Sequence, residues 1–257
     1  MASFSQLPRG LVLALTAAEY VVILTGAGIS AESGIPTFRD AQTGLWSRYD
    51  PHELATPQAF AANPRLVWEW YEWRRGLIAG AQPNAGHLAI AALQRKLPRC
   101  TLITQNVDGL HQLAGSLDVL ELHGNIERTI CSAEGVVVAD WSADLEVPPR
   151  CPQCGAYLRP DVVWFGESLP PRVINAAIDA CNRCDLFLAV GTSAVVQPAA
   201  SLAHLAAEHG AQVVEVNSER TPLTPYADFS LLGKAGELLP ALARLIDQDD
   251  TPTIDLV

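Results

Sequence analysis

The chain has 257 residues, of which 49% are hydrophobic and 18% charged, and 17 Lys and Arg against 28 Asp and Glu give a net charge of −11. This is the composition of a globular protein that is long enough to bury a large core without disulfide cross-links. Its acidity argues against nucleic acid or an anionic membrane as a partner, because neutralising phosphates requires clustered Lys and Arg.

An apolar segment near the N terminus could be mistaken for a signal peptide or a membrane-spanning helix. Residues 10–28 carry one charge, that of Glu19, and follow Arg9. However, residues 20–24 (YVVIL) are rich in β-branched side chains and lead into a glycine turn, which is typical of a buried strand. We therefore expect neither a signal peptide nor a membrane span. The expected location of the protein is the cytoplasm.

Buried strands alternate with helices along most of the chain. Apolar runs predict strands at residues 20–25, 100–104, 119–122, 186–190, 212–216 and 229–232. Helices are predicted at residues 66–79, 87–97, 172–184, 199–209 and 237–246. This alternation predicts an α/β fold with a Rossmann-like, doubly wound parallel sheet and helices on both faces. Ligands of such sheets bind in a crevice at the carboxyl ends of the strands.

Two stretches break the alternation, and we interpret them as insertions that together form a second, small domain. Residues 41–82 contain four tryptophans and a helical pattern, whereas residues 125–165 contain turn signals and three cysteines. This interpretation leaves residues 10–40, 83–124 and 166–250 for the Rossmann-like domain.

Polar residues follow five of the predicted strands. They lie at residues 26–31, 104–108, 123–125, 191–193 and 217–219. Gly and Asn form turns for local reasons, but His123 and Asp108 together favour a polar cofactor that crosses the strand ends. An ordinary Rossmann dehydrogenase also needs an acidic residue about 20 positions after the glycine turn to hold a ribose. Residues 43–46 offer none, which disfavours that class.

The sequence resembles the sirtuin family of NAD-dependent protein deacylases through seven motifs in the family's order. They are GAGISAESGIPTFRD (26–40), TQNVDGLH (104–111), ELHGN (121–125), CPQCG (151–155), RPDVVWFGE (159–167), GTSAVVQPA (191–199) and VNSE (216–219). The first motif is nearly diagnostic by itself, whereas GTS or a C-x-x-C pair alone would carry no weight.

The resemblance implies that the chain consumes NAD. In this family the amide oxygen of an acyl-lysine attacks the anomeric carbon of the nicotinamide ribose, nicotinamide leaves, and the acyl group ends on ADP-ribose. Asn106 and Asp108 are expected to act in catalysis as well as in binding. The implied NAD-binding residues are Gly26, Ala27, Gly28, Ser30, Thr37, Phe38, Arg39, Trp46, Gln105, Asn106, Asp108, Gly191, Thr192, Ser193, Asn217, Ser218, Glu219 and Ala235.

His123 is the implied general base. The family's reaction needs a group that takes a proton from a ribose hydroxyl, and the pKa of imidazole lies near the working pH. A lone histidine at a strand end would by default cap a turn, but the LHGN context favours the catalytic role.

Tyr71 and Arg74 are candidates for recognising the acyl group. A spacing of three places them on one face of the predicted helix, and a guanidinium beside a phenol suits a carboxylate. This Y-x-x-R pattern is that of the sirtuin subclass that removes succinyl, malonyl and glutaryl groups, and Ala55 matches an alanine that widens its acyl pocket. Without the resemblance, Tyr71 and Arg74 would be ordinary helix-surface residues. We expect desuccinylase activity with deacetylation retained.

The acyl-lysine peptide is expected to add a strand along residues 162–166, because strand addition reads the backbone and tolerates varied sequences. The expected contact residues are Val163, Trp164, Phe165 and Gly166, although the composition of this run fits a core strand equally well. The expected partners are acylated lysines of protein substrates, and the chain is expected to be a monomer.

Spacing alone nominates two C-x-x-C pairs, Cys151/Cys154 and Cys181/Cys184, as metal ligands. Cys181 falls on the apolar face of a predicted helix and Cys184 directly precedes a buried strand, so both are expected to be core residues, as is Cys100.

The resemblance instead pairs Cys151 and Cys154 with an earlier C-x-x-C, which in this chain reads Cys131-Ser132-Ala133-Glu134. We expect one structural zinc ion on Cys131, Cys151 and Cys154. The fourth ligand stays open: Glu134, another nearby group or water could supply it, or the site could be weakened or empty.

Two further functions are open from the sequence. A plain deacetylase or an NAD-dependent ADP-ribosyltransferase of the same family would use the same pocket. A non-catalytic module that senses NAD is of a different class, and the presence of His123, Asn106 and Asp108 together argues against it. Release of nicotinamide only after acyl-peptide is added would separate these cases.

Overall fold

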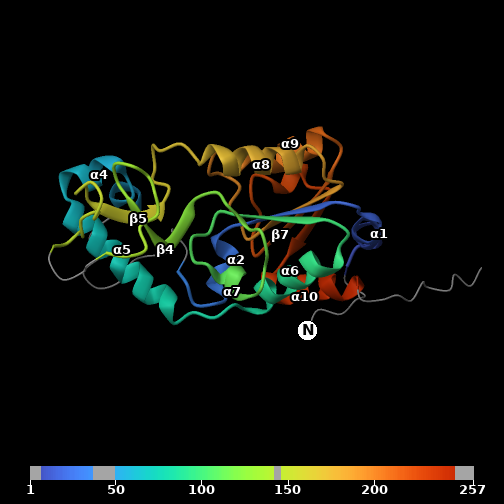
Figure 1. The fold of residues 1–257 in the computed structure, drawn as a ribbon. Coiled ribbons are helices and arrows are strands. Elements are labelled where there is room, and N and C mark those ends of the chain that lie inside the picture. The colour runs from blue at the N-terminus through green and yellow to red at the C-terminus, as the bar shows by residue number, and fades with distance from the viewer. Residues whose placement is uncertain (1–6, 37–49, 142–145, 247–257) are drawn as a thin grey trace, which may run out of the picture.

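A six-stranded, all-parallel sheet forms the centre of the fold (Figure 1). The structure is a computed structural model that describes residues 7–36, 50–141 and 146–246. The spatial order of the strands is β3-β2-β1-β6-β7-β8. The strands are β1 (Val21–Thr25), β2 (Cys100–Thr104), β3 (Leu120–Glu121), β6 (Leu186–Val190), β7 (Gln212–Asn217) and β8 (Phe229–Leu232).

The strand order reverses at β1. From β1 the chain continues outward through β2 and β3, and it later returns to pair β6 with the other edge of β1. The carboxyl ends of β1 and β6 therefore flank the point at which ligands of doubly wound sheets bind.

Helices cover both faces of the sheet because its strands are buried on both sides. Along β1, Val21 and Ile23 pack on one face and Val22 and Leu24 on the other. The first face is covered by α1 (Arg9–Ala17), α6 (Ala85–Lys96) and α10 (Ala235–Leu245), and the second by α8 (Pro171–Cys181) and α9 (Ser201–Glu208). Figure 1 shows α8 and α9 above the sheet and α6 and α10 below it.

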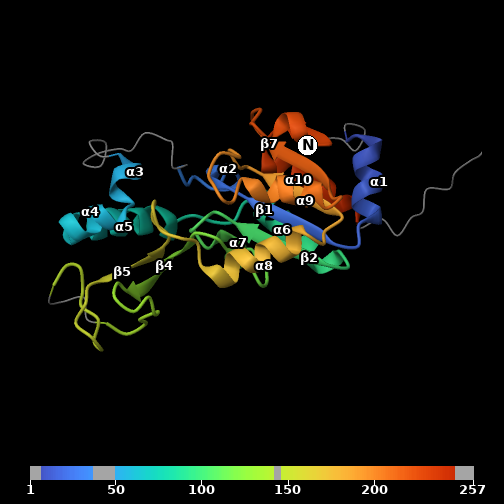
Figure 2. The ribbon, with the colours of Figure 1, turned by 90° about the horizontal axis from the view of Figure 1, so that it is seen from above.

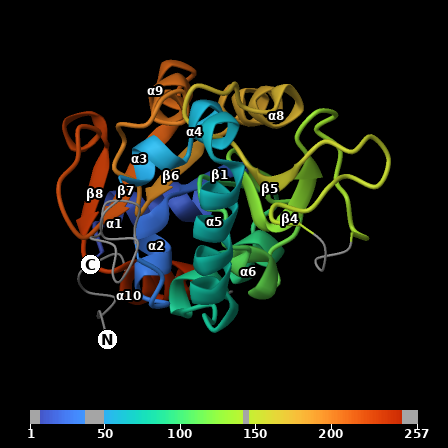
Figure 3. The same ribbon diagram turned by 90° about the vertical axis from the view of Figure 1, so that its left-hand side faces the viewer.

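A smaller unit lies beside the sheet (Figure 2). This unit, which we call the small module, is built on the helices α3 (Pro51–Leu54), α4 (Pro57–Ala62) and α5 (Pro64–Ala79) and on the antiparallel strands β4 (Gly124–Cys131) and β5 (Leu158–Val162). Its core contains Trp70 and Tyr71 from α5, Ile126 from β4, Val162 from β5, and Trp164. Figure 3 shows the long helix α5 running between α4 and α6.

The local sequence explains where α5 begins. The side chain of Asn63 accepts a hydrogen bond from the N–H of Leu66, and Pro64 occupies the first turn, where its missing N–H has no cost. One side of the helix then presents Val67, Trp70 and Tyr71 to the core of the module.

The predicted α/β class with its parallel, doubly wound sheet is confirmed. The five predicted helices and six predicted strands match elements of the structure to within a few residues at their ends. The sequence had not indicated α1 as a helix, nor the β4–β5 pair. Among the described residues, no helix is both long and apolar enough to cross a membrane.

Candidate active site and metal centre

Two loops approach each other through their backbones at the carboxyl ends of β1 and β6. The N–H of Gly28 donates to the carbonyl oxygen of Gly191 at 2.8 Å. A Cβ atom on Gly26 or Gly28 would lie 2.8 Å from backbone atoms of Gly191 or Thr192. Gly191 itself has φ +59°, and its Cβ would lie 2.5 Å from the nitrogen of Ile29. Only glycine fits these three positions, so the two loops contact each other here through backbone groups.

Side chains from three strand ends meet beside these loops. The amide nitrogen of Gln105 donates to Oγ1 of Thr192 at 2.9 Å, and that of Asn217 donates to the carbonyl oxygen of Thr192 at 2.9 Å. The ends of β2, β6 and β7 are thereby fixed to one another. This confirms that parallel strands bring residues distant in the chain to one edge.

A hydrogen-bonded chain joins Asn106, Ser30 and Asp108. The amide nitrogen of Asn106 donates to Oγ of Ser30 at 3.0 Å and to the carbonyl oxygen of Gly26 at 3.1 Å. The hydroxyl of Ser30 donates to Oδ2 of Asp108 at 2.7 Å, and Oδ1 of Asp108 accepts from the N–H of Leu110. Because Asp108 and Ser30 are buried, this chain holds the Asn106 amide in one orientation.

Two buried histidines lie behind this chain. The rings of His87, from α6, and His111, from α7 (Leu110–Leu113), are 4.9 Å apart. Nε2 of His111 hydrogen-bonds with Oγ1 of Thr25 at 2.9 Å. Burial lowers the pKa of His87 to about 4 and that of His111 to about 3. Both rings are therefore neutral at neutral pH.

His123 directly precedes β4. Its Nδ1 lies 2.9 Å from the carbonyl oxygen of Gln105. A carbonyl oxygen only accepts, so Nδ1 carries the proton and Nε2 keeps its lone pair in the neutral ring. Burial lowers the pKa of His123 from its usual value near 6.5, and the hydrogen bond to Gln105 opposes part of this shift. The structure thus provides a half-buried imidazole whose Nε2 can accept a proton near neutral pH.

The other residues implied in NAD binding differ in exposure. Ala27 begins α2 (Ala27–Ala31) and Ala235 begins α10, where it is buried against α6. Ser193 is half-buried, whereas Ser218 and Glu219 are exposed after β7. Thr37, Phe38, Arg39 and Trp46 lie outside the residues that the structure describes.

Tyr71 and Arg74 do share one side of α5. The guanidinium carbon of Arg74 lies 5.7 Å from the centre of the Tyr71 ring and 5.0 Å from that of Trp70. Burial raises the pKa of Tyr71 and lowers that of Arg74. Ala55 is buried in the same hydrophobic cluster as Tyr71. The guanidinium of Arg74 is half-buried beside these rings.

The indole of Trp164 reaches into the same cluster. Its Nε1–H donates to the hydroxyl oxygen of Tyr71 at 3.0 Å, so the Tyr71 hydroxyl can still donate its own hydrogen. Trp164 is only 2% exposed. Its role in the small module is therefore that of a core side chain.

The segment expected to pair with the substrate peptide lies after β5, which ends at Val162. The N–H of Val163 donates to the carbonyl oxygen of His123, and that of Phe165 to the carbonyl oxygen of Ala55, both at 2.9 Å. The N–H of Trp164 donates to Glu167, and Gly166 adopts φ +88°. The backbone N–H groups of residues 163–165 are therefore all bonded within the chain.

Arg159 and Glu167 hold this segment in place. The guanidinium of Arg159 binds both carboxylate oxygens of Glu167, at 2.6 and 2.9 Å, and donates to the carbonyl oxygen of Val162 at 2.7 Å. It also lies 3.2 Å from the centre of the Trp164 ring. Sequence reasoning assigned no role to Arg159 or Glu167, although both belong to the quoted RPDVVWFGE motif.

Sequence reasoning also missed His87, His111 and Glu215. Glu215, on β7, is buried and accepts from the hydroxyls of Thr221, Thr224 and Ser230, which fixes the segment after Asn217. His111 belongs to the quoted TQNVDGLH motif, which could have drawn attention to it, whereas His87 and Glu215 lie in ordinary helical and strand patterns that carry no signal for such contacts.

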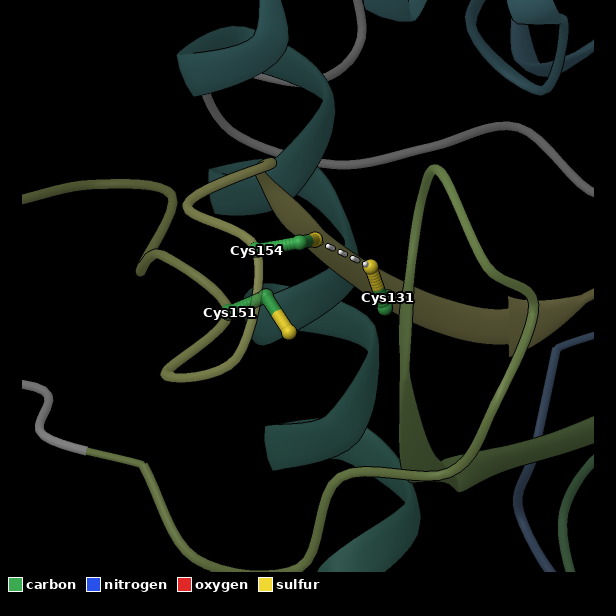
Figure 4. Close-up of side chains that lie close together, drawn as sticks. All are labelled: Cys131, Cys151 and Cys154. Atoms are coloured by element: carbon green, nitrogen blue, oxygen red, sulfur yellow. Dashed lines mark hydrogen bonds between the residues drawn. The ribbon is translucent and has the colours of Figure 1, made fainter.

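Three cysteines of the small module point toward one another (Figure 4). The sulfur atoms of Cys131, Cys151 and Cys154 all lie within 4.8 Å of one another, and those of Cys131 and Cys154 are 3.4 Å apart. In a tetrahedral zinc site with Zn–S bonds of about 2.3 Å, neighbouring sulfurs are about 3.8 Å apart. The backbone N–H groups of Cys154 and Gln153 lower the pKa of the Cys151 thiol. For the Cys154 thiol, the backbone bond with Ala156 lowers the pKa, but the neighbouring thiols of Cys131 and Cys151 outweigh this bond and the pKa is raised. The three residues fit a structural zinc ion.

The second C-x-x-C pair is not part of this cluster. Cys181 and Cys184 are buried beneath α8 and β6, and burial raises their thiol pKa values to about 12 and about 11. Cys100 packs against the other hydrophobic cluster of the sheet, and burial raises its pKa to about 12. The prediction of core residues is confirmed for Cys181 and Cys184, whereas Cys100 is half-buried at the margin of its cluster.

Comparison with known proteins identifies the family. Residues 26–198 match the model of the Sir2 family. The chain is 52% identical over 244 residues to a Pseudomonas aeruginosa protein named NAD-dependent protein deacylase 1, covering 92% of this chain and 98% of that protein.

The chain belongs to the Sir2 family.

Solved structures agree with this assignment. A crystal structure of a Sir2 homologue in complex with NAD is 49% identical, covers 94% of both chains and superposes with a TM-score of 0.87. A Sir2 structure with a p53 peptide and NAD⁺ is 31% identical, covers 92% of this chain and 97% of that one, and has a TM-score of 0.82. The predicted sirtuin resemblance is confirmed, and the three-cysteine cluster matches the zinc site expected in the small module.

Proposed function

We propose that this Sir2 protein is an NAD-dependent protein-lysine deacylase that removes succinyl and malonyl as well as acetyl groups. The observation that carries the proposal is the His123 imidazole, which is held by the Gln105 carbonyl so that Nε2 is its basic atom. It belongs to a crevice at the switch point of a parallel sheet, and its relatives are named NAD-dependent protein deacylases.

NAD is held by the strand ends that meet in this crevice. Gly26, Gly28 and Gly191 allow the phosphates to approach backbone N–H groups, as their crowded positions support. Gln105, Thr192 and Asn217 hold the ribose and phosphate side, with Glu219 toward the adenosine. NAD supplies the anomeric carbon of the nicotinamide ribose. Nicotinamide leaves this carbon, and the amide oxygen of the acyl-lysine bonds to it.

His123 acts as general base. Nε2 takes the proton from a ribose hydroxyl so that this oxygen can attack the acyl carbon. The Nδ1–H bond to Gln105 stabilises the imidazolium that results, because a charged donor strengthens the bond. Asn106 and Asp108, which are fixed through Ser30, orient the nicotinamide and its ribose.

Arg74 and Tyr71 bind the carboxylate of a succinyl or malonyl group. Arg74 supplies a half-buried cation, and Tyr71 keeps a hydroxyl hydrogen to donate because its oxygen already accepts from Trp164. The small side chain of Ala55 leaves room in the same cluster. The uncharged acetyl group makes no bond to Arg74 but still fits the acyl pocket.

The acyl-lysine peptide lies against residues 163–166. The Arg159–Glu167 pair supports this segment, and strand-like docking through the backbone accommodates varied targets. We further propose a cytoplasmic monomer in which residues 41–82 and 125–165 fold as one domain. The net charge of −11 supports the absence of nucleic acid and anionic membranes among its partners.

The test measures nicotinamide release from NAD with acetyl-lysine and succinyl-lysine peptides. Wild type should release nicotinamide only when an acylated peptide is present. Arg74→Met should lose about 10-fold to 100-fold in kcat/KM on the succinyl peptide, because a charged hydrogen bond contributes about 1.5–3 kcal/mol, and should change little on the acetyl peptide.

Arg65→Met is the matched control, since Arg65 lies on the same helix but is exposed and pairs with Glu69. It should leave both activities unchanged. Equal losses on both peptides in Arg74→Met would contradict the carboxylate role, and no release with any acyl peptide would contradict deacylation itself.

A further inference from the structure

Two turns of the small module carry the three cysteines, and their backbones are hydrogen-bonded alike. In the first turn, residues 131–135, the N–H of Gly135 donates to the carbonyl oxygen of Cys131, and the N–H of Cys131 donates to that of Val136. In the second turn, residues 151–155, the N–H of Gly155 donates to Cys151, and the N–H of Cys151 donates to Ala156. All four distances lie between 2.7 and 2.9 Å.

The glycines that close the two turns are alike as well. Gly135 has φ +65° and Gly155 has φ +74°, and a Cβ atom on either would meet nothing within 4 Å. Glycine is favoured here by the backbone conformation and not by crowding. Each turn therefore ends in a glycine with positive φ, four positions after Cys131 or Cys151.

The two turns are also joined to each other. The N–H of Ser132 in the first turn donates to the carbonyl oxygen of Tyr157, two residues after the second turn, at 3.0 Å. Cys131 also pairs with Leu158 in the β4–β5 register. The second turn thus presents two thiols, Cys151 and Cys154, and the first turn presents one, Cys131, toward the common centre.

The likeness of the turns identifies a position that matches Cys154. Cys154 stands three residues after Cys151 and one before Gly155, and Glu134 stands three residues after Cys131 and one before Gly135. We propose that Glu134 is the fourth ligand of the metal centre, binding through one carboxylate oxygen, so that the site is a three-sulfur, one-oxygen zinc site.

The chemistry of the donor set supports this assignment. A divalent zinc ion with three thiolates has a net charge of −1. A fourth thiolate or a carboxylate changes the net charge to −2, whereas a neutral water leaves it at −1. A carboxylate therefore reproduces the charge of a four-cysteine site. Zinc accepts carboxylate oxygen at about 2.0–2.2 Å.

Glu134 must turn inward to bind. Its side chain is exposed, and its carboxylate does not belong to the cluster of three sulfur atoms. The side chain is two bonds longer than that of cysteine and rotates about three bonds, which gives its carboxylate a longer reach than a cysteine sulfur has. Rotating an exposed side chain inward costs little beyond its rotamer entropy.

The test compares the zinc-loaded full chain with Glu134→Cys, Glu134→Ala and the control Glu127→Ala, all prepared under reducing conditions. Glu127 is an exposed carboxylate on β4 of the same module, so its removal changes charge without touching the turn. X-ray absorption at the zinc edge should give three sulfur ligands and one oxygen in wild type and four sulfur ligands in Glu134→Cys.

X-ray absorption does not separate a carboxylate from a water ligand, because both bind zinc through oxygen. The affinity for zinc separates them. Losing an outer-shell partner costs about 10–100-fold in metal affinity, so competition with a chelator should show at least a tenfold weaker zinc complex for Glu134→Ala. Glu127→Ala should equal wild type, and Glu134→Cys should bind at least as tightly. Equal affinity of Glu134→Ala and wild type would overturn the proposal, as would less than one zinc per chain in wild type.

Discussion

The carboxyl edge of the sheet and the small module achieve their geometry in different ways. At the sheet edge, loops that are far apart in the chain meet through backbone atoms, as at Gly28 and Gly191. In the small module, the key contacts join side chains, as between Trp164 and Tyr71 or among the three cysteines. The loops at the sheet edge can approach because their glycines have no side chain. The small module depends on which side chains it carries.

This difference teaches where substitution is tolerated. A site formed by backbone atoms keeps its shape whenever the strands and glycines are kept. A site formed by paired side chains changes its chemistry when one of them differs. Glu134 stands in the first cysteine turn at the position that Cys154 holds in the second, although the two backbones are hydrogen-bonded alike.

The largest effect is expected at the sheet edge, from His123→Ala. General bases contribute about 10²–10⁴-fold, so acyl transfer should fall by this factor because no other group replaces Nε2. The measurement is single-turnover formation of acyl-ADP-ribose, with thermal unfolding to show that the fold is kept. Full turnover by a folded variant would contradict the role of His123.

The pH profile of wild type gives an independent check on the same residue. The pKa of His123 is lowered, so its neutral, basic form persists to pH values below 6.5. Activity should therefore fall on acidification only below pH 6.5. A profile whose acidic limb lies above this pH would assign the titration to another group.

A second prediction concerns the stability of the sheet edge in acid. His87 and His111 have folded-state pKa values of about 4 and about 3, below the unfolded value of 6.5. Between pH 6.5 and 4 the unfolded state binds more protons, so stability decreases as the pH falls, by up to about 1.4 kcal/mol per pH unit for each histidine. Denaturant unfolding between pH 7 and 5 measures the slope.

Removing an exposed histidine provides the control for this slope. His204→Asn changes a side chain on the outer surface of α9 and should leave the pH dependence unchanged. A free energy of unfolding that stays constant from pH 6.5 to 5 would show that these two rings are not buried in neutral form.

Gly28→Ala is expected to have a moderate effect. The added methyl group would lie 2.8 Å from the Cα and carbonyl oxygen of Gly191, and forcing such atoms apart costs about 1–3 kcal/mol. We expect this loss in the free energy of unfolding together with a raised KM for NAD. Gly76→Ala, at an open position within α5, should be neutral or stabilising, and similar results for both variants would contradict the close approach of the loops.

The smallest effect is expected in the small module, from Trp164→Phe. This change keeps an aromatic ring but removes the Nε1–H that holds the Tyr71 hydroxyl. One hydrogen bond contributes about 0.5–1.5 kcal/mol, so KM for a succinyl peptide should rise by about 2-fold to 10-fold. The acetyl peptide serves as the internal control, and an equal rise on both peptides would show that the bond from Trp164 to Tyr71 does not serve carboxylate recognition.

The same comparison explains how far the sequence predicts the molecule. Strands β1 and β6 are buried along their whole length, so they read as nearly continuous apolar runs, and polar residues after them and after β2 mark the strand ends at which ligands bind. Helix α1 was missed because its apolar run merges with that of β1 and was considered only as a signal peptide or membrane span.

The small module was harder to predict because its elements depend on distant partners. Strand β4 has a mixed burial pattern and an irregular register between Asn125 and Thr129, so it lacks the alternation of a regular strand. Tyr71 and Trp164 are separated by 93 residues, and no local pattern indicates that they touch. Spacing alone nominated the buried pair Cys181/Cys184 as well as Cys151/Cys154, and Cys131 was added only through the sirtuin resemblance. The common centre of the three cysteines is visible only in the folded chain.

The bond from the N–H of Phe165 to the carbonyl oxygen of Ala55 has a practical consequence for protein engineering. Together with the Trp164–Tyr71 contact, it ties the segment proposed to hold the peptide to the helices proposed to hold the acyl group. In a chimaera that imports only one of these segments from a relative, the backbone bond forms only if the two segments fit each other, and the Trp164–Tyr71 contact needs both side chains. Exchanging acyl preference between Sir2 proteins should therefore succeed when residues 50–80 and 158–167 are transplanted as a pair.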